Sequence, residues 1–429
     1  MIDETHDAKL TSWVDSASGH GDFPIQNLPF GSFSPPDEAP RPGVAIGDHI
    51  LELQALVAAG MLREAPASLE PVLATPPLRK SLRKSLSRLL SDPKYRNNAE
   101  PYLHAAADCT LHLPVHIGDY TDFYVGIHHA TNVGALFRPD NPLLPNYKHV
   151  PIGYHGRASS VRPSGAPVVR PTGQTRAPDA EAPTFGPSRR LDFELELGVW
   201  IGPGNGLGQP IRIDDAAQHI GGFCLLNDWS ARDLQAWEYQ PLGPFLAKNF
   251  LTTISPWIVT PEALAPFRMA QAQRPEGDPK PLPYLWSDAD QSTGALALDL
   301  DVLIQTAAMR DAGIPPQVLT RSEARHMYWT FAQIVTHHAS SGCNLQTGDL
   351  LGTGTLSGDR PGTEGSLLEL SAGGKKPVSL PNGEERSFLL DGDEIILRAR
   401  AEKEGFASIG FGDCRGKIFA AQAPRGSSQ

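Results

Sequence analysis

The stretch Leu191-Asp192-Phe193-Glu194-Leu195-Glu196-Leu197-Gly198 alternates strictly between apolar and acidic side chains. A period of two is typical of a β-strand, whose successive side chains point to opposite faces. The pattern therefore predicts a strand with Glu194 and Glu196 on one face and Phe193, Leu195 and Leu197 on the other. An ordinary half-buried strand with both acids in water would show the same alternation, so the flanking sequence has to decide.

Two flanking stretches also set acids among aromatic or small apolar residues: Asp119-Tyr120-Thr121-Asp122-Phe123-Tyr124 and Asn227-Asp228-Trp229-Ser230-Ala231-Arg232-Asp233. A solitary charge is costly to desolvate in such surroundings, and carboxylates drawn together repel one another unless a cation joins them. We interpret the three stretches as one site for a hard divalent metal. Ligands that offer only oxygen favour magnesium, calcium or manganese over zinc or copper, and here they are Asp122, Glu194, Glu196 and Asp228.

Bulk properties limit the class of protein. A chain of 429 residues predicts two domains, and its 41 glycines and 40 prolines suit a turn-rich β architecture. The formal net charge of -11 argues against nucleic acid or an anionic membrane as the partner. The four cysteines lack CxxC spacing, and we find neither an apolar signal core nor a bilayer-spanning stretch. These features predict a soluble cytoplasmic protein.

Residues 1–115 are expected to form a separate small lobe. Residues 44–53 are typical of a hairpin with a Gly-Asp turn, and the leucines at 78, 82, 86, 89 and 90 fall at helical spacing. That helix also carries five basic residues, which we interpret as a solvated face: Arg79, Lys80, Arg83, Lys84 and Arg88.

From residue 116 onward, short apolar runs separated by Gly, Pro and Asn predict an extensive mixed β structure. Helices are expected at 213–220, 230–239 and 321–341, and surface loops at 268–292 and 371–386. In the glycine-rich turn at 352–358, Thr355 is a candidate to face a ligand.

Histidines follow the first acid closely, in Ile127-His128-His129-Ala130-Thr131-Asn132. A lone histidine is more often structural than catalytic, but one near a metal ligand can take a proton from a water beside the cation. The spacing does not choose between His128 and His129. His337 and His338, near the end of an expected helix, are interpreted as packing residues.

Six longer motifs resemble the fumarylacetoacetase family. They are DYTDFY with HATNVG and FRP (119–139), GYHGRASS (153–160), LDFELELG (191–198), NDWSARDLQAWEYQPLGPFLAKNF (227–250), THHASSGCNLQTGDLLGTGTLSG (336–358) and GSLLEL (365–370). PFGSF (30–34) and the hairpin extend the likeness into the N-terminal lobe. Six ordered motifs of this length make the resemblance highly specific.

The resemblance implies a role for each matching residue. It gives the metal ligands as Asp122, Glu194, Glu196 and Asp228, with Lys248 and Thr252 beside a second cation. It makes His129 the general base and Glu369 the carboxylate that orients that base. The group that stabilises developing negative charge would be Arg232, Gln235 and Lys248. Substrate contacts would be made by Tyr124, Arg138, Gln235, Tyr239 and Thr355, with Tyr154 lining the same cleft.

The resemblance also implies a fold and a reaction. The fold would be mainly β, with a small SH3-like barrel at 1–115 followed by a large mixed β-sandwich roll at 116–429, assembled as a homodimer. The reaction would be metal-dependent hydrolysis of a carbon–carbon bond in the β-diketone 4-fumarylacetoacetate, which gives fumarate and acetoacetate. It would complete the catabolism of tyrosine and phenylalanine, with Mg²⁺ or Ca²⁺, or with Mn²⁺, as the metal.

Two alternatives stay open at this point. A related acylpyruvate or diketo-acid hydrolase, or a decarboxylase, would keep the four acids. A non-catalytic, metal-dependent protein that binds organic acids would also keep them, but it would have no need of a His–Glu pair. Loss of diketone absorbance with stoichiometric release of fumarate separates the three.

Overall fold

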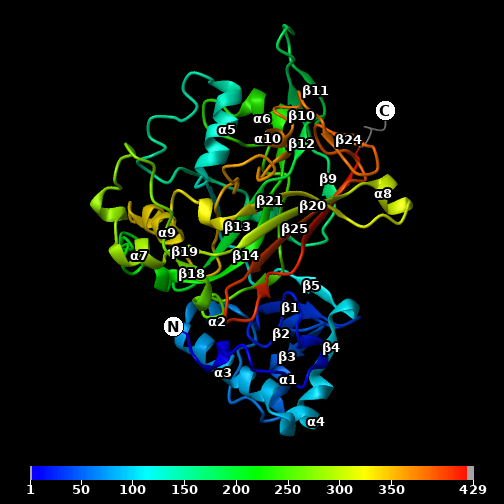
Figure 1. Ribbon diagram of the computed structural model, residues 1–429, viewed down its shortest axis with the longest axis vertical. Coiled ribbons are helices and arrows are strands. Elements are labelled where there is room, and N and C mark those ends of the chain that lie inside the picture. The colour runs from blue at the N-terminus through cyan, green and yellow to red at the C-terminus, as the bar shows by residue number, and fades with distance from the viewer. Residues whose placement is uncertain (1, 423–429) are drawn as a thin grey trace, which may run out of the picture.

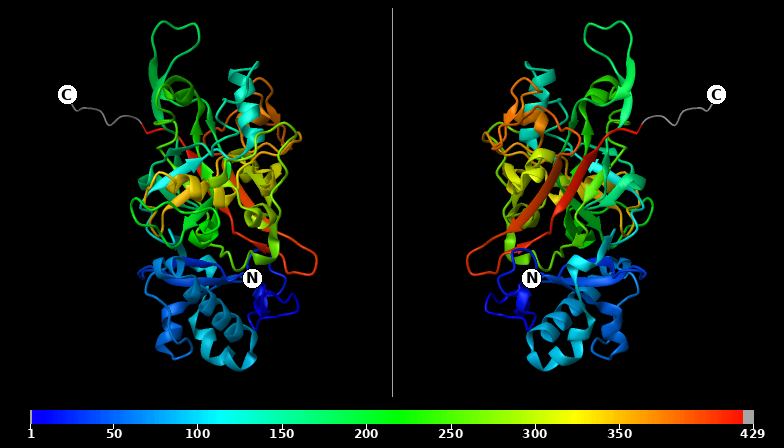
Figure 2. Two further views of the ribbon diagram at one scale, coloured as in Figure 1. Left: turned by 90° about the vertical axis from the view of Figure 1, so that its left-hand side faces the viewer. Right: turned by 90° about the vertical axis from the view of Figure 1, so that its right-hand side faces the viewer.

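The computed structural model describes residues 2–422 and consists mainly of β-sheet with few helices. An N-terminal lobe, drawn from blue to cyan, lies below a larger body formed by the rest of the chain (Figures 1 and 2). The mainly β class predicted from the sequence is confirmed. None of the helices within residues 2–422 combines the length and the apolar character needed to cross a membrane.

One six-stranded sheet organises the N-terminal lobe, in the order β17-β1-β2-β3-β4 with β5 paired to β1. Its strands are β1 (Phe30–Ser34), β2 (Arg41–Ile46), β3 (His49–Glu52), β4 (Leu103–Ala105), β5 (Thr110–His112) and β17 (Trp257–Ile258). The predicted hairpin is β2–β3, with Gly47 at φ 55 in its turn. Because β17 comes from much later in the chain, the lobe is tied to the larger body. The assignment of this lobe to an SH3-like barrel stays a prediction.

Figure 1 shows α1 (Leu53–Ala58), α3 (Pro76–Ser91) and α4 (Arg96–Ala99) in the lower part of this lobe, whereas α2 (Glu70–Ala74) lies where the lobe meets the larger body. The predicted basic helix is α3, but the interpretation of its basic residues as a solvated face is wrong for Arg79 and Arg83, which are buried. Arg79 pairs with Glu262 at 2.6 Å, and Arg83 donates to Thr5 and to two backbone carbonyls. Both arginines hold the helix against the rest of the molecule, because their partners lie far from it in sequence.

The larger body contains two main sheets. The first has the order β7-β6-β22-β13-β14-β16-β8 and the second β21-β20-β25-β27-β9, with β26 paired to β25. The first consists of β6 (Tyr120–Phe123), β7 (Gly153–His155), β8 (Val161–Pro163), β13 (Leu195–Ile201), β14 (Ile220–Asp228), β16 (Thr252–Ile254) and β22 (Leu350–Gly352). The second consists of β9 (Val168–Val169), β20 (Asp299–Gln305), β21 (Gln317–Glu323), β25 (Glu394–Ala401), β26 (Ile409–Gly410) and β27 (Cys414–Phe419).

The alternating stretch 191–198 is extended, but it is not one continuous strand. β12 (Leu191–Asp192) pairs with β15 (Ser230–Ala231), and β13 then pairs with β14 and β22. Between them the Glu194 N–H donates to the side-chain oxygen of Asn227 on β14 at 3.0 Å, where a regular strand would donate to a backbone carbonyl. The predicted alternation nevertheless holds, because Phe193, Leu195 and Leu197 are all buried in the main apolar core.

Two of the expected helices are shorter than predicted, and one is a single turn. At 213–220 there is only a 3-10 turn, Ala216–His219, and at 230–239 the strand β15 precedes α6 (Arg232–Glu238). At 321–341 the chain continues β21 to Glu323, makes a 3-10 turn at Ala324–His326 and becomes helical only in α9 (Phe331–Ala339). Thr330 starts α9 by accepting from the Gln333 N–H, a capping interaction that fixes the helix start.

The sequence reasoning missed α5 (Ile127–Phe137), the helix that carries His129. No side chain caps its start at Gly126, and a second glycine lies inside it at 134, so its helical signals are weak. The expected loops at 268–292 and 371–386 are largely irregular. The remaining short elements are α7 (Asp288–Thr293), α8 (Ala307–Asp311), α10 (Leu367–Leu370), β10 (Thr172–Thr175), β11 (Thr184–Pro187), β18 (Arg268–Met269), β19 (Ala295–Leu296), β23 (Val378–Ser379) and β24 (Glu385–Arg386).

Candidate active site

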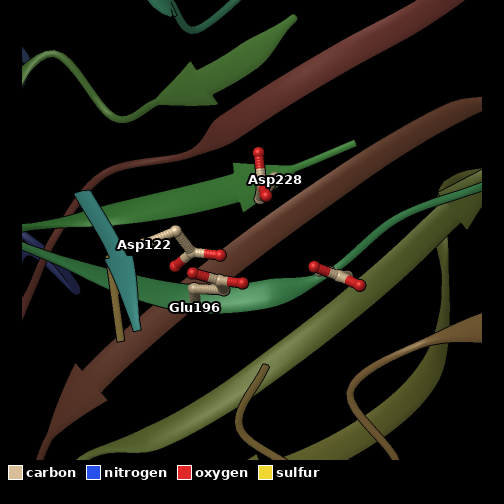
Figure 3. Close-up of side chains that lie close together, drawn as sticks. Asp122, Glu196 and Asp228 are labelled. Carbon is tan, nitrogen blue, oxygen red and sulfur yellow. The ribbon is translucent and has the colours of Figure 1, made fainter. Parts of the chain in front are cut away.

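Four acidic side chains converge in the first sheet of the larger body. Asp122 lies on β6, Glu196 on β13, Asp228 at the end of β14, and Glu194 just before β13. Each offers a carboxylate oxygen within 4.8 Å of the others, and all four side chains are buried. Figure 3 shows Asp122, Glu196 and Asp228 directed toward one another from three separate strands. The structure therefore brings together all four acids predicted to bind a metal.

Two glycines let these carboxylates approach. Gly352 pairs with Asp122 on one side and with Gly198 on the other, and a Cβ atom on Gly352 would lie 2.4 Å from Asp122 Oδ1. Gly354, at φ 75, turns its N–H toward Asp122 Oδ1 (3.1 Å) and Glu196 Oε2 (3.0 Å). The glycine-rich turn after β22 thus leaves room for one carboxylate and donates to two.

Positive charge reaches only part of the acidic cluster. Lys248 contacts Glu194 and lies 2.9 Å from Asp228 Oδ2, and Arg232 Nη1 lies 2.7 Å from Glu194 Oε1. Hydroxyl groups complete the surroundings of Asp228, with Thr252 donating to Oδ1 and Tyr154 to Oδ2, both at 2.8 Å. Asp122 and Glu196 receive no such cationic partner among the described residues.

The pKa directions follow this uneven distribution. Burial, together with the nearby carboxylate of Asp228, raises the pKa of Asp122 well above its usual value. Burial and the carboxylate of Asp122 do the same to the pKa of Glu196. Burial also opposes ionisation of Glu194, but Lys248 and Arg232 outweigh it and lower the pKa of Glu194 to about 2.

The acidic cluster fits a hard divalent cation. Its donor atoms are carboxylate oxygens, which Mg²⁺ and Ca²⁺ prefer. Two buried oxygens near the cluster have no hydrogen-bond partner within residues 2–422. They are Glu196 Oε1 and the hydroxyl of the neighbouring Tyr120. A cation among the four carboxylates would relieve the repulsion that raises the pKa of two of them.

A histidine and a glutamate from distant parts of the chain meet beside the cluster. His129 Nδ1 on α5 lies 2.6 Å from Glu369 Oε2 on α10, and both side chains are buried. Burial opposes ionisation of Glu369, but His129 and several hydrogen bonds outweigh it and lower the pKa of this carboxyl. An ionised Glu369 accepts a hydrogen bond from Nδ1–H of His129. The lone pair of Nε2 is then free to take a proton from another group. Of the two histidines that spacing left open, only His129 makes this contact.

Three residues that sequence reasoning missed also hold Glu369. Ser357 donates to both of its oxygens at 2.9 and 3.0 Å, Ser366 to Oε2 at 2.7 Å, and Asn132 to Oε1 at 2.9 Å. Asn132 follows His129 by three residues, so the two share a face of α5. A correct prediction of α5 would have revealed Asn132, and Ser366 stands three residues before Glu369 in the Ser-x-x-Glu pattern of a helix start. No local signal identifies Ser357.

A cavity of about 430 Å³ is lined both by His129 and by two of the four acids, Asp122 and Glu194. Most of the predicted site residues line it: Asp122, Tyr124, His129, Arg138, Tyr154, Glu194, Arg232, Gln235, Tyr239, Lys248 and Thr355. Asp228 and Thr252 instead line a smaller cavity of about 180 Å³, which shares Tyr154 and Lys248 with the first. Glu196 and Glu369 do not line this cavity, but both contact residues that do. Glu369 contacts His129, and Glu196 lies beside Asp122 and Glu194.

Unused donors face the cavity. Arg232 Nη2 and Thr355 Oγ1 are buried and find no hydrogen-bond partner within residues 2–422. Arg138 follows α5 at the cavity edge, where its exposed guanidinium donates to the Pro142 carbonyl at 3.1 Å. The site thus combines a candidate base, an acidic cluster that fits a cation, and free donors around one cavity.

Comparison with known families agrees with this geometry. The sequence profile described as "Fumarylacetoacetate (FAA) hydrolase C-terminal" matches residues 120–418, and "Fumarylacetoacetase N-terminal" matches residues 26–114. The chain belongs to the fumarylacetoacetase family.

Full-length relatives support this membership, and a solved structure shares the fold. Fumarylacetoacetase from Rattus norvegicus is 45% identical, with 94% of this chain and 97% of the relative aligned. The Arabidopsis thaliana fumarylacetoacetase is 46% identical, with 96% and 99% aligned. A fumarylacetoacetate hydrolase from Exiguobacterium antarcticum superimposes with a TM-score of 0.50 at 17% identity, over 92% of this chain and 99% of that one. This last likeness shows the fold alone, and it confirms the mainly β fold expected for the fumarylacetoacetase family, without the detail of an N-terminal SH3-like barrel.

Proposed function

We propose that this chain hydrolyses 4-fumarylacetoacetate to fumarate and acetoacetate. The observation that carries the proposal is that His129, backed by Glu369, lines the same cavity as Asp122 and Glu194. The near-complete alignment with proteins named fumarylacetoacetase supports the choice of substrate. A protein that only binds organic acids would have no use for a buried base of this kind.

The chain's own residues supply a base and several donors. Nε2 of His129 would take a proton from water, and the resulting hydroxide would add to the carbonyl carbon of the fumaryl group. The carbon–carbon bond would then break, with the electron pair and a proton going to the acetoacetate fragment. Arg232 Nη2, Lys248 and Gln235 would stabilise the oxyanion as it forms. A divalent cation held by the four acids would supply further positive charge beside the diketone oxygens.

Substrate recognition would depend on the other side chains that line the cavity. Arg138 is proposed to bind a substrate carboxylate through its planar pair of donors. Tyr124, Tyr154, Tyr239, Gln235 and Thr355 are proposed to complete the contacts, because each lines the same cavity.

For the metal we propose Mg²⁺ or Ca²⁺, with Mn²⁺ as a further candidate, because all four ligands are carboxylates. Lys248 and Thr252 are proposed to border a second cation beside Asp228. A protonated lysine has no lone pair, so Lys248 would balance charge there and not coordinate the ion.

We also propose the setting of the reaction and the assembly of the protein. The reaction would complete tyrosine and phenylalanine catabolism in the cytoplasm. The chain would act as a homodimer, and each subunit would consist of the two domains 1–115 and 116–429. Sedimentation at micromolar concentration tests the dimer, and expression of residues 1–115 alone tests whether that unit folds.

The activity is tested by following the diketone absorbance of fumarylacetoacetate while fumarate is measured separately. One fumarate should be released for each diketone lost, in protein loaded with Mg²⁺ or Ca²⁺. A matched assay with an acylpyruvate addresses the related hydrolases. Turnover of the acylpyruvate without turnover of fumarylacetoacetate would replace the proposed substrate.

A further inference from the structure

Asp192 lies two residues before Glu194 and is fully buried, yet it does not line the cavity. Its carboxylate accepts four hydrogen bonds. Oδ1 accepts from the N–H groups of Leu367 (2.7 Å) and Phe193 (2.9 Å). Oδ2 accepts from the Leu368 N–H (3.0 Å) and from Arg232 Nε (2.9 Å).

These donors belong to two different parts of the site. Leu367 and Leu368 are the first two residues of α10, whose third residue is Glu369, the partner of His129. Arg232 is the first residue of α6, and its Nη1 lies 2.7 Å from Glu194. One carboxylate therefore connects the segment that orients the base with the arginine whose Nη2 has no partner in the described residues.

We propose that Asp192 is a positioning residue that holds α10 and Arg232 in one fixed frame. Through this frame, His129, held by Glu369, and the free donor of Arg232 keep their places on one cavity. The inference rests on the proposed hydrolysis, and it assigns to Asp192 no contact with substrate. Misplacing a catalytic group by about 1 Å can reduce a rate by about 10²-fold, so a positioning carboxylate has a measurable effect.

Asp192→Asn is the first test, because it keeps the shape but puts an amide nitrogen where an acceptor is needed. An amide accepts on one side only, so in either orientation one backbone N–H of α10 loses its acceptor, and in one of the two orientations Arg232 loses its acceptor as well. We expect kcat for fumarylacetoacetate to fall by about 10- to 100-fold while KM changes by less than about threefold. Mn²⁺ affinity should stay within about threefold of the wild type, because Asp192 is not among the four acids.

Asp233→Asn is the matched control on the neighbouring residue of α6. Its carboxylate accepts from Ser188 Oγ (2.6 Å) and from the Arg189 N–H (2.7 Å), and neither partner belongs to the site. This variant should keep wild-type kcat.

A second pair of variants tests a single hydrogen bond to Asp192 and leaves the Asp192 carboxylate in place. Leu367→Pro deletes the N–H donated to Asp192, and Leu367→Ala shortens the same side chain but keeps that N–H. Proline is tolerated at the first position of a helix, and the preceding Ser366 is extended at φ -148 and ψ 154, as a residue before proline should be. We expect kcat of Leu367→Pro to lie about 5- to 20-fold below that of Leu367→Ala.

The outcomes separate the inference from the function on which it rests. If the wild type releases no fumarate, the proposed function fails and this role of Asp192 falls with it. If the wild type is active but Asp192→Asn matches Asp233→Asn in kcat per metal-binding protein, Asp192 is merely structural and the inference is wrong. Should Asp192→Asn fail to fold, the proline and alanine variants decide, and equal kcat values for those two would overturn the inference.

Discussion

At the cavity edge, Arg138 offers a planar guanidinium whose observed partner is the Pro142 carbonyl. Arg138→Ala should raise KM by about 10- to 100-fold with a smaller change in kcat, because a carboxylate contact made in both ground and transition states is lost. Arg138→Lys should have a KM between those of the wild type and Arg138→Ala, since lysine keeps the charge but not the paired donors. Steady-state kinetics measures both parameters. A fall in kcat alone would assign Arg138 to the chemical step.

The absence of a side chain at Gly352 lets the carboxylates of Asp122 and Glu196 lie close to the backbone. A Cβ there would come within 2.4 Å of Asp122 Oδ1 and 3.1 Å of Glu196 Oε2. Gly352→Ala should therefore weaken binding of Mn²⁺ or Mg²⁺ by at least about tenfold, as measured by calorimetry, because ligand position is disturbed. Gly186→Ala is the control, since within residues 2–422 its Cβ would meet no atom inside 4 Å. Equal affinities in the two variants would contradict this view of the cluster.

Among individual residues, the acids were easier to predict than their partners. The alternation at 191–198 and two acidic motifs pointed to all four carboxylates before any family likeness was used. By contrast, Ser357 and Asp192 act through contacts with residues farther along the chain, and no local pattern marks them. Their roles depend on which segments the fold brings together. Ser366 stands three residues before Glu369 in the Ser-x-x-Glu pattern of a helix start, a local signal that sequence reasoning did not use.

Among the elements, α3 shows how a polar helix is held in place. Arg83 donates to Thr5 Oγ1 and to the carbonyls of Asn27 and Gln26, while Lys84 beside it is half-exposed. Arg83→Ala should lower the free energy of unfolding by about 2–4 kcal/mol, because buried acceptors lose their donor. Lys84→Ala should leave the urea midpoint unchanged. Similar midpoints for the two variants would mean that Arg83 adds nothing to the docking of α3.

Elements with strong periodicity were predictable, and those fixed by distant contacts were not. The leucine spacing of α3 and the Gly-Asp turn of β2–β3 gave correct predictions. The helix α5 was missed because Gly126 starts it without a side-chain cap and Gly134 interrupts its helical propensity. In 321–341, apolar residues suggested one long helix, but β21 pairs along β20 as far as Glu323, and this pairing overrides the local pattern.

For the whole molecule, metal and pH should act together on stability. Burial and neighbouring carboxylates raise the pKa of Asp122 and Glu196 in the folded protein. The metal-free folded state then binds more protons than the unfolded state, so these two acids lower its stability as pH rises above their usual range, about pH 4. Glu194, with its pKa lowered to about 2, stabilises the folded state instead. This contribution is complete above about pH 4.5 and is lost as pH falls toward 2.

Thermal unfolding with and without Mg²⁺ measures this linkage. The increase in Tm caused by Mg²⁺ should be larger near pH 8 than near pH 5.5, because the metal displaces protons at the lower pH. Glu196→Gln should reduce both the increase and its pH dependence. An increase in Tm that is independent of pH would mean that these acids do not titrate against the metal.

The pairing of His129 with Glu369 depends on the complete fold, because 240 residues separate them. The central claim is that they act as one base beside the acidic cluster, and a double-mutant cycle on fumarate release by metal-loaded protein tests it most directly. His129→Ala should lower kcat by several orders of magnitude and Glu369→Gln by about 10²–10⁴-fold, with the double variant scarcely worse than His129→Ala. His128→Ala, the control next in sequence, should keep most activity. Losses that multiply in the double variant, with every protein folded and metal-loaded, would contradict the account.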